Sequence, residues 1–283
     1  IYEKRNGFNV LGRLDLNGPA DAPALVIGAH LDHLGRGEAS GSLARGDERG
    51  QIHHGADDNA SGVAALLEIA EYFAAERAAG RLQGVRDVVF AAWEGEELGL
   101  LGSSHFVEDA KKQAGKDTLA GAYSAYLNMD MVGRLKDSLV LQGVGSSSVW
   151  TREVEQRNAV IGLPVKTVSD TYLPTDATSF YIAGVPILAA FTGSHEEYHS
   201  PRDTADLINY KGLHDIARLM SLIARSQAQA ATPPDYIKVE NTQSQGRVGN
   251  VFLGTIPDYA SEGVKGVKIS GVMQGGPAAK AGL

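Results

Sequence analysis

The chain contains no cysteine, no hydrophobic run long enough to cross a bilayer and no excess of basic residues. Without cysteine there can be no disulfide, thiolate metal site or thiol nucleophile, although periplasmic and cytosolic proteins can both do without it. A membrane-spanning helix needs about 18 or more consecutive apolar residues, and no run of that length occurs. With 26 basic against 34 acidic residues and no local basic patch, the sequence argues against nucleic-acid binding.

The length of the chain, 283 residues, fits one large α/β domain followed by a small module. It begins with Ile1 rather than Met and shows no signal-peptide pattern, so we expect a processed or truncated product. Thr232-Pro233-Pro234 marks a boundary, and we predict a main domain over residues 1–232 and a short segment over residues 236–283. A segment of about 50 residues would be marginal as an independent unit.

Short apolar runs that alternate with helical patterns predict an α/β fold. Several runs are almost continuously apolar, which is typical of strands covered on both faces. The predicted strands span residues 9–16, 24–29, 88–93, 122–127, 139–144, 165–168 and 185–191. The predicted helices follow residue 62 and span residues 98–110, 147–161, 175–183 and 206–228. We therefore expect a mixed, mostly parallel β-sheet sandwiched between helices.

Two adjacent acids, Glu96 and Glu97, follow the apolar run that ends at Trp93. In open α/β sheets, ligands and chemistry collect outside the carboxyl ends of the strands. A Glu-Glu pair in a connecting loop is by itself usually solvated. The other strands decide between these two interpretations, because several of them end in the same way.

Histidine and acidic residues follow other predicted strands. The run at residues 24–29 leads into His30-Leu31-Asp32-His33, where alternation along the strand directs His30 and Asp32 to the same side. Asp32 would then accept the second ring N–H of His30 or stand beside it in a site, although a lone His-x-Asp pair is equally consistent with a structural role. Asp130 follows the strand at residues 122–127, and His199 lies in the loop after residues 185–191.

Asp57 and Asp58 lie between Gly55 and Gly62, just before a helical pattern. Asp is a good helix N-cap, which would explain one of the two acids. Because capping needs only one, we predict that the other carboxylate, Asp58, binds a metal. The preceding residues, 35–54, are rich in Gly, Ser, Arg and Asp and predict a long surface loop.

Together these segments supply two histidines and three carboxylates as candidate metal ligands: His30, Asp58, Glu97, Asp130 and His199. This nitrogen and oxygen donor set suits zinc, with manganese and cobalt as alternatives. Two divalent cations would be balanced by three carboxylates and one bridging hydroxide. Glu96 is not counted as a ligand and is therefore free to act as general base on a metal-bridging water.

The motifs that carry these residues resemble, in order, those of the co-catalytic dizinc aminopeptidases. This family includes the bacterial secreted leucine aminopeptidases and, more distantly, glutamate carboxypeptidase and glutaminyl cyclase. The resemblance covers about residues 8–230. It rests on His30-x-Asp32, the Gly-Ala-Asp-Asp-Asn-Ala-Ser-Gly sequence at 55–62, the Trp-Glu-Gly-Glu-Glu-Leu-Gly sequence at 93–99, Asn128-Met129-Asp130, and Tyr198-His199-Ser200 followed by Asp203-Thr204.

The resemblance implies two zinc ions that share one ligand, Asp58. His30 and Asp130 would complete one metal site, and Glu97 and His199 would complete the other.

It also implies roles for residues that do not bind metal. Glu96 would be the general base and Asp32 a carboxylate behind His30. Tyr198 matches a tyrosine that in some members helps to hold the tetrahedral oxyanion. Three histidines match no ligand position and are expected to be solvated or packed behind the ligands: His53, His54 and His195.

Residues 236–283 resemble the opening of a PDZ domain. Phe252-Leu253-Gly254 would match the carboxylate-binding loop, and the segment from Gly276 to Leu283 the first helix. The chain stops before such a domain could finish, so we expect an incomplete peptide groove. A peptide ligand is expected only for a complete domain.

We therefore expect a dizinc metallo-exopeptidase, an aminopeptidase that acts on peptides with a free N-terminus. A carboxypeptidase or a glutaminyl cyclase-like enzyme of the same fold is the alternative. Carboxylate recognition would call for a basic cluster, whereas only Arg134 and Arg202 lie close to the motifs in sequence. A non-catalytic binding protein is disfavoured, because all five ligands and the base are present. We expect the protein to be soluble and periplasmic or secreted.

Overall fold

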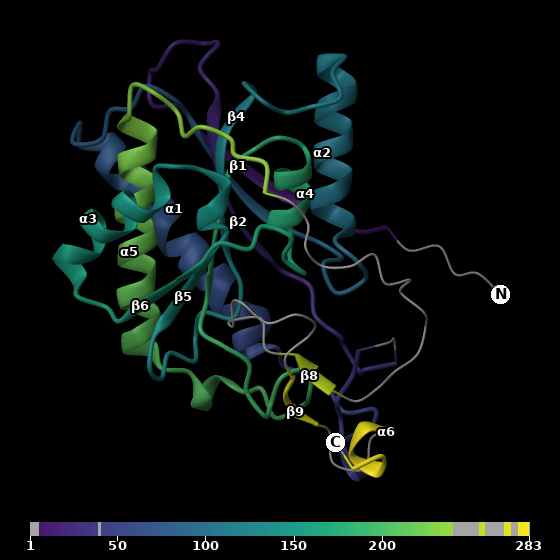
Figure 1. Ribbon diagram of the computed structural model, residues 1–283. Coiled ribbons are helices and arrows are strands. Elements are labelled where there is room, and N and C mark those ends of the chain that lie inside the picture. Colours follow the sequence, from purple (N-terminus) through teal and green to yellow (C-terminus); the bar gives the residue numbers. More distant parts are fainter. Residues whose placement is uncertain (1–5, 39–40, 240–254, 258–268, 273–276, 283) are drawn as a thin grey trace.

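The computed structural model describes residues 6–38, 41–239, 255–257, 269–272 and 277–282. Within these residues one sheet has the strand order β1-β3-β2-β4-β7-β5-β6 (Figure 1). The bounds of its strands are β1 Val10–Leu14, β2 Ala24–His30, β3 Val88–Trp93, β4 Tyr123–Met129, β5 Leu139–Gln142, β6 Val165–Val168 and β7 Ile187–Phe191. The helices that pack on it are α1 Gly62–Ala78, α2 Leu101–Ala114, α3 Trp150–Ile161, α4 Ala177–Ile182 and α5 Tyr210–Gln229.

The four central strands of the sheet are parallel. β2 pairs with both β3 and β4, and β4 pairs with β7, all in parallel register. At one edge of the sheet β1 pairs antiparallel with β3. On the other side of the central strands, β5 pairs antiparallel with β7. The carboxyl ends of β2, β3, β4 and β7 consequently lie at one edge of the sheet, the position where α/β proteins place their sites.

Helices cover both faces of the sheet, as expected from the continuous apolar strands. α1, α3 and α5 pack together on one face, and α2 and α4 pack together on the other (Figure 1). All seven residues of β2 are buried. On the α4 face, the Tyr126 ring stacks on the Phe180 ring with centroids 4.2 Å apart. Burying a large apolar side chain contributes roughly 1.5–3 kcal/mol, so this two-sided core holds the strand ends in fixed positions.

Four helices start later than the sequence predicts, at Leu101, Trp150, Ala177 and Tyr210, and for the first and last of them a local feature gives the reason. The helix expected from residue 98 begins at Leu101, because Gly99 and Leu100 adopt left-handed φ values of 102° and 60°. The helix expected from residue 206 begins at Tyr210, where the Asn209 side chain accepts the Gly212 N–H at 2.9 Å. The residues before Asn209 form a separate short 3-10 turn at Ala205–Leu207. In both cases a local cap or turn overrides the hydrophobic periodicity.

Residues 235–239 are bonded to the main domain. The Ile237 N–H donates to the Ser146 carbonyl at 2.8 Å, and the Tyr181 hydroxyl of α4 donates to the Ile237 carbonyl at 3.1 Å. Ser147 and Ser148 donate to the Asp235 carboxylate. The first residues of the predicted C-terminal segment thus contact α4 of the main domain. The division into residues 1–232 and 236–283 remains a prediction.

The predicted PDZ-like segment is described only in pieces. Phe252-Leu253-Gly254, Gly276 and Leu283 lie outside the described residues. Within the described part, β8 (Thr255–Pro257) pairs antiparallel with β9 (Ile269–Val272), and Pro277–Lys280 form the short helix α6.

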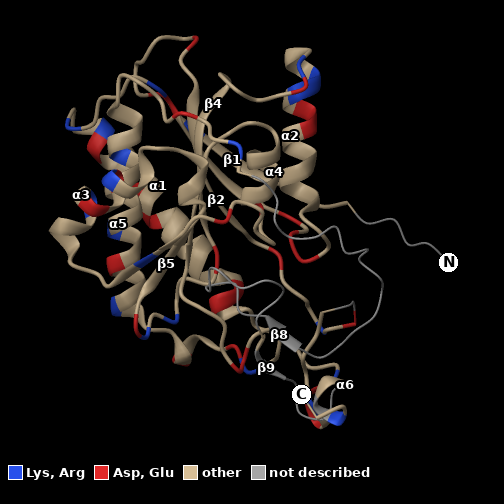
Figure 2. Ribbon diagram, viewed as in Figure 1, with Lys and Arg blue, Asp and Glu red and all other residues tan. Residues whose placement is uncertain are grey.

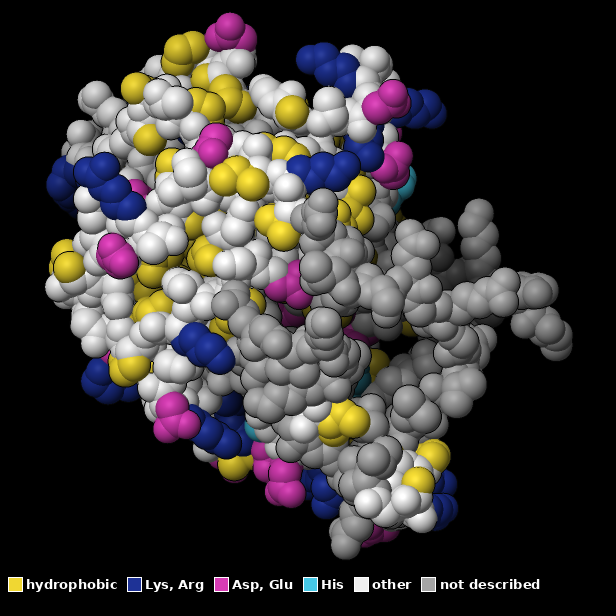
Figure 3. All heavy atoms as spheres, viewed as in Figure 1, with side chains coloured by type: hydrophobic (Ala, Val, Ile, Leu, Met, Phe, Trp, Pro, Cys, Tyr) yellow, Lys and Arg dark blue, Asp and Glu magenta, His cyan; other side chains and the backbone are white. Residues whose placement is uncertain are grey.

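Charged residues are distributed over the outer helices without a basic patch on the face that is seen. Both α2 and α5 carry acidic and basic residues (Figure 2). Lys and Arg side chains stand as separate groups on the face in Figure 3. Among the described residues, no helix combines the length and the apolar character needed to span a membrane.

Candidate metal centre

The candidate ligands meet at the carboxyl edge of the sheet. His30 is the last residue of β2, Glu97 follows β3, and Asp130 follows β4 directly. His199 comes from the loop after β7, and Asp58 comes from the distorted helical turn Ala56–Ser61 that leads into α1. Five side chains from five separate segments therefore converge above the central strands.

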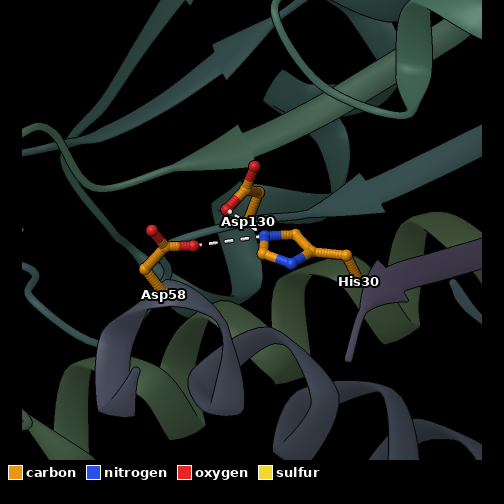
Figure 4. Close-up of side chains that lie close together, drawn as sticks. All are labelled: His30, Asp58 and Asp130. Carbon is orange, nitrogen blue, oxygen red and sulfur yellow. Dashed lines mark hydrogen bonds and ion pairs between the residues drawn. The ribbon is translucent and has the colours of Figure 1, made fainter. Parts of the chain in front are cut away.

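The His30 ring lies between two carboxylates. His30 Nε2 is 3.2 Å from Asp58 Oδ1 and 3.4 Å from Asp130 Oδ1 (Figure 4). The ring is buried and points from the end of β2 toward both acids (Figure 4).

The other oxygen of Asp58 faces a second histidine. His199 Nε2 is 3.2 Å from Asp58 Oδ2 and 3.0 Å from Glu97 Oε2. Asp58 therefore directs its two oxygens at two different histidine and carboxylate pairs, His30 with Asp130 and His199 with Glu97.

Backbone carbonyls bind the opposite nitrogens of these two rings. His30 Nδ1 lies 3.1 Å from the Asp32 carbonyl, and His199 Nδ1 lies 2.9 Å from the Gly41 carbonyl. This arrangement leaves each Nε2 directed at the carboxylates, as is usual for histidines that bind metals. Gly41 belongs to the loop of residues 35–54, which is also held by an ion pair of 2.8 Å between Glu48 and Arg202.

The turn that carries Asp58 is fixed by its neighbours. Asn59 Nδ2 donates to the Met129 carbonyl at 3.0 Å, and Asn59 Oδ1 accepts the N–H groups of Gly62 and Met131. A Cβ atom on Gly62 would lie 2.4 Å from the Met129 carbonyl oxygen, so only glycine lets α1 approach β4 this closely. Asp203 accepts the N–H of Asp58 at 3.1 Å.

Asp57 makes contacts different from those of Asp58. Asp57 Oδ1 accepts the Gly133 N–H at 2.6 Å, and Asp57 Oδ2 lies 3.1 Å from His195 Nε2. His195 is buried and also approaches Glu197, whereas His54 is exposed. Of the two adjacent acids, Asp58 is the one that the structure places among the other candidate ligands.

Asp32 supports the turn that carries the two glutamates. Its carboxylate accepts the backbone N–H groups of Glu96 at 3.0 Å and Glu97 at 3.2 Å. Asp32 Oδ1 lies 3.8 Å from His30 Nδ1, whereas the Asp32 backbone carbonyl oxygen lies closer to that nitrogen, at 3.1 Å. Gly95 turns the chain between the strand and the glutamates with φ 74°. Asp32 therefore lies behind both His30 and the pair of glutamates.

Burial and mutual contacts shift the pKa values of the site. Burial raises the pKa of Glu96 to about 9, with further contributions from Asp130 and Asp176. Burial would also raise the pKa of Asp58, but hydrogen bonds from His199 and His30 outweigh it and hold that pKa well below its usual range. The site thus combines a carboxylate that stays ionised with a neighbouring acid that holds its proton more strongly.

A further acid, Asp176, lies close to this group at the start of α4. Its side chain is 1% exposed, and neither carboxylate oxygen has a hydrogen-bond partner of normal geometry in the described part of the chain. Burial raises the pKa of Asp176 to about 7, against an opposing effect of the Ser103 hydroxyl.

His33 also belongs to the cluster, although the sequence offered no role for it. His33 Nδ1 lies 2.7 Å from Glu97 Oε1 and 3.9 Å from Asp58 Oδ2. The signal that could have found it was its place in the His30-Leu31-Asp32-His33 sequence, at the same strand end as His30.

An open pocket adjoins the cluster on the side of Asp130. Met131, Thr175 and Phe191 line it together with Asp130 and Tyr198. The Tyr198 ring stacks on the His199 ring at 3.7 Å. Burial raises the pKa of Tyr198 well above its usual value, so its hydroxyl keeps its proton.

The donor set fits divalent metal ions. Within the described ranges, two groups of side chains have ligand atoms close enough to share an ion: His30, Asp58 and Asp130, and His33, Asp58 and Glu97. Nitrogen and oxygen donors of this kind suit zinc.

Comparison with known proteins identifies the family. Residues 9–224 match the profile of peptidase family M28. An aminopeptidase of Pseudomonas aeruginosa is 32% identical over 133 residues, which are 47% of this chain and 19% of that protein. The chain matches between 19% and 36% of the length of the first curated relatives, so it spans well under half of each.

Solved structures share the fold. The zinc aminopeptidase BSAP from Bacillus subtilis superposes with a TM-score of 0.61 at 21% identity, over 81% of this chain and 53% of that one. The glutaminyl cyclase of Porphyromonas gingivalis superposes with a TM-score of 0.59 at 18% identity, over 77% of each chain. At these identities the likeness concerns the fold alone.

Proposed function

We propose that this chain, which belongs to peptidase family M28, is a dizinc aminopeptidase that hydrolyses the N-terminal peptide bond of peptides. The observation that carries the proposal is the placement of Asp58, whose two oxygens lie 3.2 Å from His30 Nε2 and 3.2 Å from His199 Nε2. A carboxylate shared in this way between two donor groups is what a bridging ligand requires.

In this proposal each ion has two further protein ligands. One ion would be held by His30 and Asp130, the other by Glu97 and His199, with Asp58 common to both. Both histidines already have Nδ1 bonded to a backbone carbonyl, which favours metal binding through Nε2. When bound, zinc ions lower the pKa of water and polarise the substrate carbonyl.

Glu96 would act as the general base. It lies next to Glu97 in the turn after β3, and the Asp32 carboxylate accepts its backbone N–H at 3.0 Å. A buried carboxyl whose pKa is raised to about 9 is a strong proton acceptor once ionised, and bound cations would lower this pKa toward neutrality. Glu96 would take the proton of the attacking water and pass it to the leaving amine.

Tyr198 would donate its hydroxyl to the tetrahedral oxyanion. This role is supported by its ring position against His199 and by its place in the lining of the pocket. The pocket beside Asp130 offers room for the first side chain of the substrate.

The ion pairs of two nearby arginines favour an aminopeptidase over a carboxypeptidase, because a carboxypeptidase needs basic groups that are free to bind the substrate's C-terminal carboxylate. Arg134 pairs with Glu197 at 2.7 Å, and Arg202 pairs with Glu48 at 2.8 Å. Since both guanidinium groups are already engaged by carboxylates, they are poorly placed to bind a substrate C-terminus. A glutaminyl cyclase activity is the second candidate, because a cyclase shares the fold.

We also propose that residues 236–283 begin a PDZ-like module that would bind a peptide when complete, and that the enzyme acts in the periplasm or outside the cell. The antiparallel pairing of β8 with β9 and the helix α6 support the first of these.

A substrate panel tests the proposed activity. The panel consists of one peptide with a free N-terminus, its N-acetylated form, its C-terminal amide and a peptide that starts with glutamine, with bound metal measured on the same protein. We expect two zinc ions per chain, loss of the first residue from the free peptide and from the amide, and no cleavage after acetylation. Cleavage from the C-terminus would indicate a carboxypeptidase, and ring closure of the glutamine peptide a cyclase. A chain without bound metal or turnover would indicate a binding protein.

A further inference from the structure

Three imidazoles, not two, surround the carboxylates of Asp58 and Glu97. The third is His33, three residues beyond His30. The His33 ring centroid lies 5.7 Å from that of His199. Its side chain is 10% exposed, so it belongs to the interior of the site.

His33 differs from His30 and His199 in which ring nitrogen faces the carboxylates. His30 and His199 each have Nδ1 bonded to a backbone carbonyl, with Nε2 facing the carboxylates. His33 is reversed, since Nδ1 faces Glu97 Oε1 at 2.7 Å. His33 Nε2 is buried and has no hydrogen-bond partner in the described ranges of the chain.

This difference bears on which ring nitrogen of His33 carries a proton toward Glu97. If Nδ1 bound a metal, Nε2 would carry the proton, and a buried N–H group would have no acceptor. If Nδ1 carries the proton, it is donated to a carboxylate at a distance typical of charge-assisted hydrogen bonds. Nε2 lacks a partner in either arrangement, so the short contact of Nδ1 with Glu97 Oε1 favours the second.

The chain packs closely around the His33 ring. A Cβ atom on Gly55 would lie 2.8 Å from both Cγ and Cδ2 of His33, so the Gly55 backbone presses against the ring. His53 stands on the loop side with its ring centroid 6.3 Å away, and its own Nε2 is bonded to Ser42 Oγ at 2.9 Å. The ring is therefore packed by the chain on either side.

We propose that His33 is a positioning residue for the metal centre, which donates Nδ1–H to Glu97 Oε1 and thereby directs Glu97 Oε2 alone to the metal site shared with His199. Glu97 Oε2 already lies 3.0 Å from His199 Nε2. His33 would thus make Glu97 a one-oxygen ligand. This inference rests on the proposed metal centre.

Two amide substitutions test the proposal, because they place the same donor at different positions. In His33→Asn the amide nitrogen replaces Nδ1, whereas in His33→Gln it replaces Nε2. The exposed His54 provides the control His54→Gln. The measurement is the dissociation constant of each of the two zinc equivalents, obtained by competition with a chromophoric chelator.

We expect His33→Gln to weaken one zinc equivalent by about 10–100-fold, the usual effect of losing a group that orients a metal ligand. His33→Asn should stay close to the parent and to His54→Gln, and the other zinc equivalent should not change. Equal, severe loss of one zinc in both His33 variants would show that His33 is itself a ligand. Unchanged affinities in both variants would show that it has no role. If the parent protein binds no zinc, the proposed function fails instead.

Discussion

The carboxylate of Asp32 accepts the backbone N–H of Glu96 at 3.0 Å. A second N–H, that of Glu97, binds its other oxygen. Asp32→Asn keeps the shape but has one acceptor oxygen, so one of the two N–H groups loses its partner. We expect kcat/KM to fall roughly 10–100-fold, as for other groups behind metal ligands. Steady-state kinetics beside the exposed control Asp21→Asn would measure this, and equal rates in the two variants would contradict the proposed support.

Glu96 and Glu97 should respond differently to the same substitution. Glu96→Gln cannot accept a proton, so we expect kcat to fall about 10²–10⁴-fold with KM little changed. Its zinc content should remain that of the parent, whereas Glu97→Gln should lose zinc first. Kinetics and metal analysis on both variants separate the roles. A zinc-depleted Glu96→Gln protein, or a fully loaded and active one, would mean that another group is the base.

Asp58→Asn should weaken both zinc ions together. The substitution removes a negative charge from between two cations that then repel each other. Asp57→Asn is the matched comparison, because the Asp57 oxygens are taken by Gly133 and His195. Zinc titrations of both variants would test the assignment. Should Asp57→Asn lose both ions while Asp58→Asn keeps them, the two acids exchange roles.

Asp176 should make the stability of the metal-free protein depend on pH. Burial raises its folded-state pKa to about 7, above the unfolded value, so folding retains a proton that the unfolded chain releases. Its contribution to stability is neutral below the unfolded pKa near 4 and becomes unfavourable as pH rises to about 7. Asp176→Asn should therefore raise the free energy of unfolding at pH 8, by on the order of 3 kcal/mol, and by less at pH 5.

Urea unfolding of the chelator-treated parent and Asp176→Asn at both pH values measures this effect. Asp21→Asn again serves as the exposed control. A difference between parent and Asp176→Asn that is the same at pH 5 and pH 8 would show that Asp176 titrates normally.

Much of the sheet and the meeting of the candidate ligands could be predicted, for one physical reason. Strands that are buried on both faces have continuously apolar sequences, so the first polar residue after each apolar run marks the end of a strand. The strand before Glu96 ends at Trp93, as predicted, and the short strand at residues 165–168 has its predicted bounds. Parallel strands place such ends at one edge of a sheet, which is why His30 and Asp130 lie together.

The grouping of the ligands around Asp58 followed from the family resemblance, but the hydrogen bonds that orient their side chains could not be predicted, because they join residues far apart in sequence. The proton acceptor of His199 is a carbonyl of Gly41, 158 positions away, in a loop without periodicity. The role that we infer for His33 depends on the contact of its Nδ1 with Glu97 and on the buried Nε2, which lacks a partner among the described residues. Helix starts were missed for a local reason, since caps such as Asn209 act on single residues.

The bond between Gly41 and His199 has a consequence for engineering the proposed peptidase. The loop of residues 35–54 is an obvious place to widen access for larger substrates, because it lies at the surface and has no regular core. However, its Gly41 carbonyl holds the ring that we propose as a zinc ligand, at 2.9 Å. Shortening the loop would then trade substrate scope against metal retention, so redesigns should keep residues 41–43 and the ion pair of Glu48 with Arg202, and vary the exposed residues 45–47.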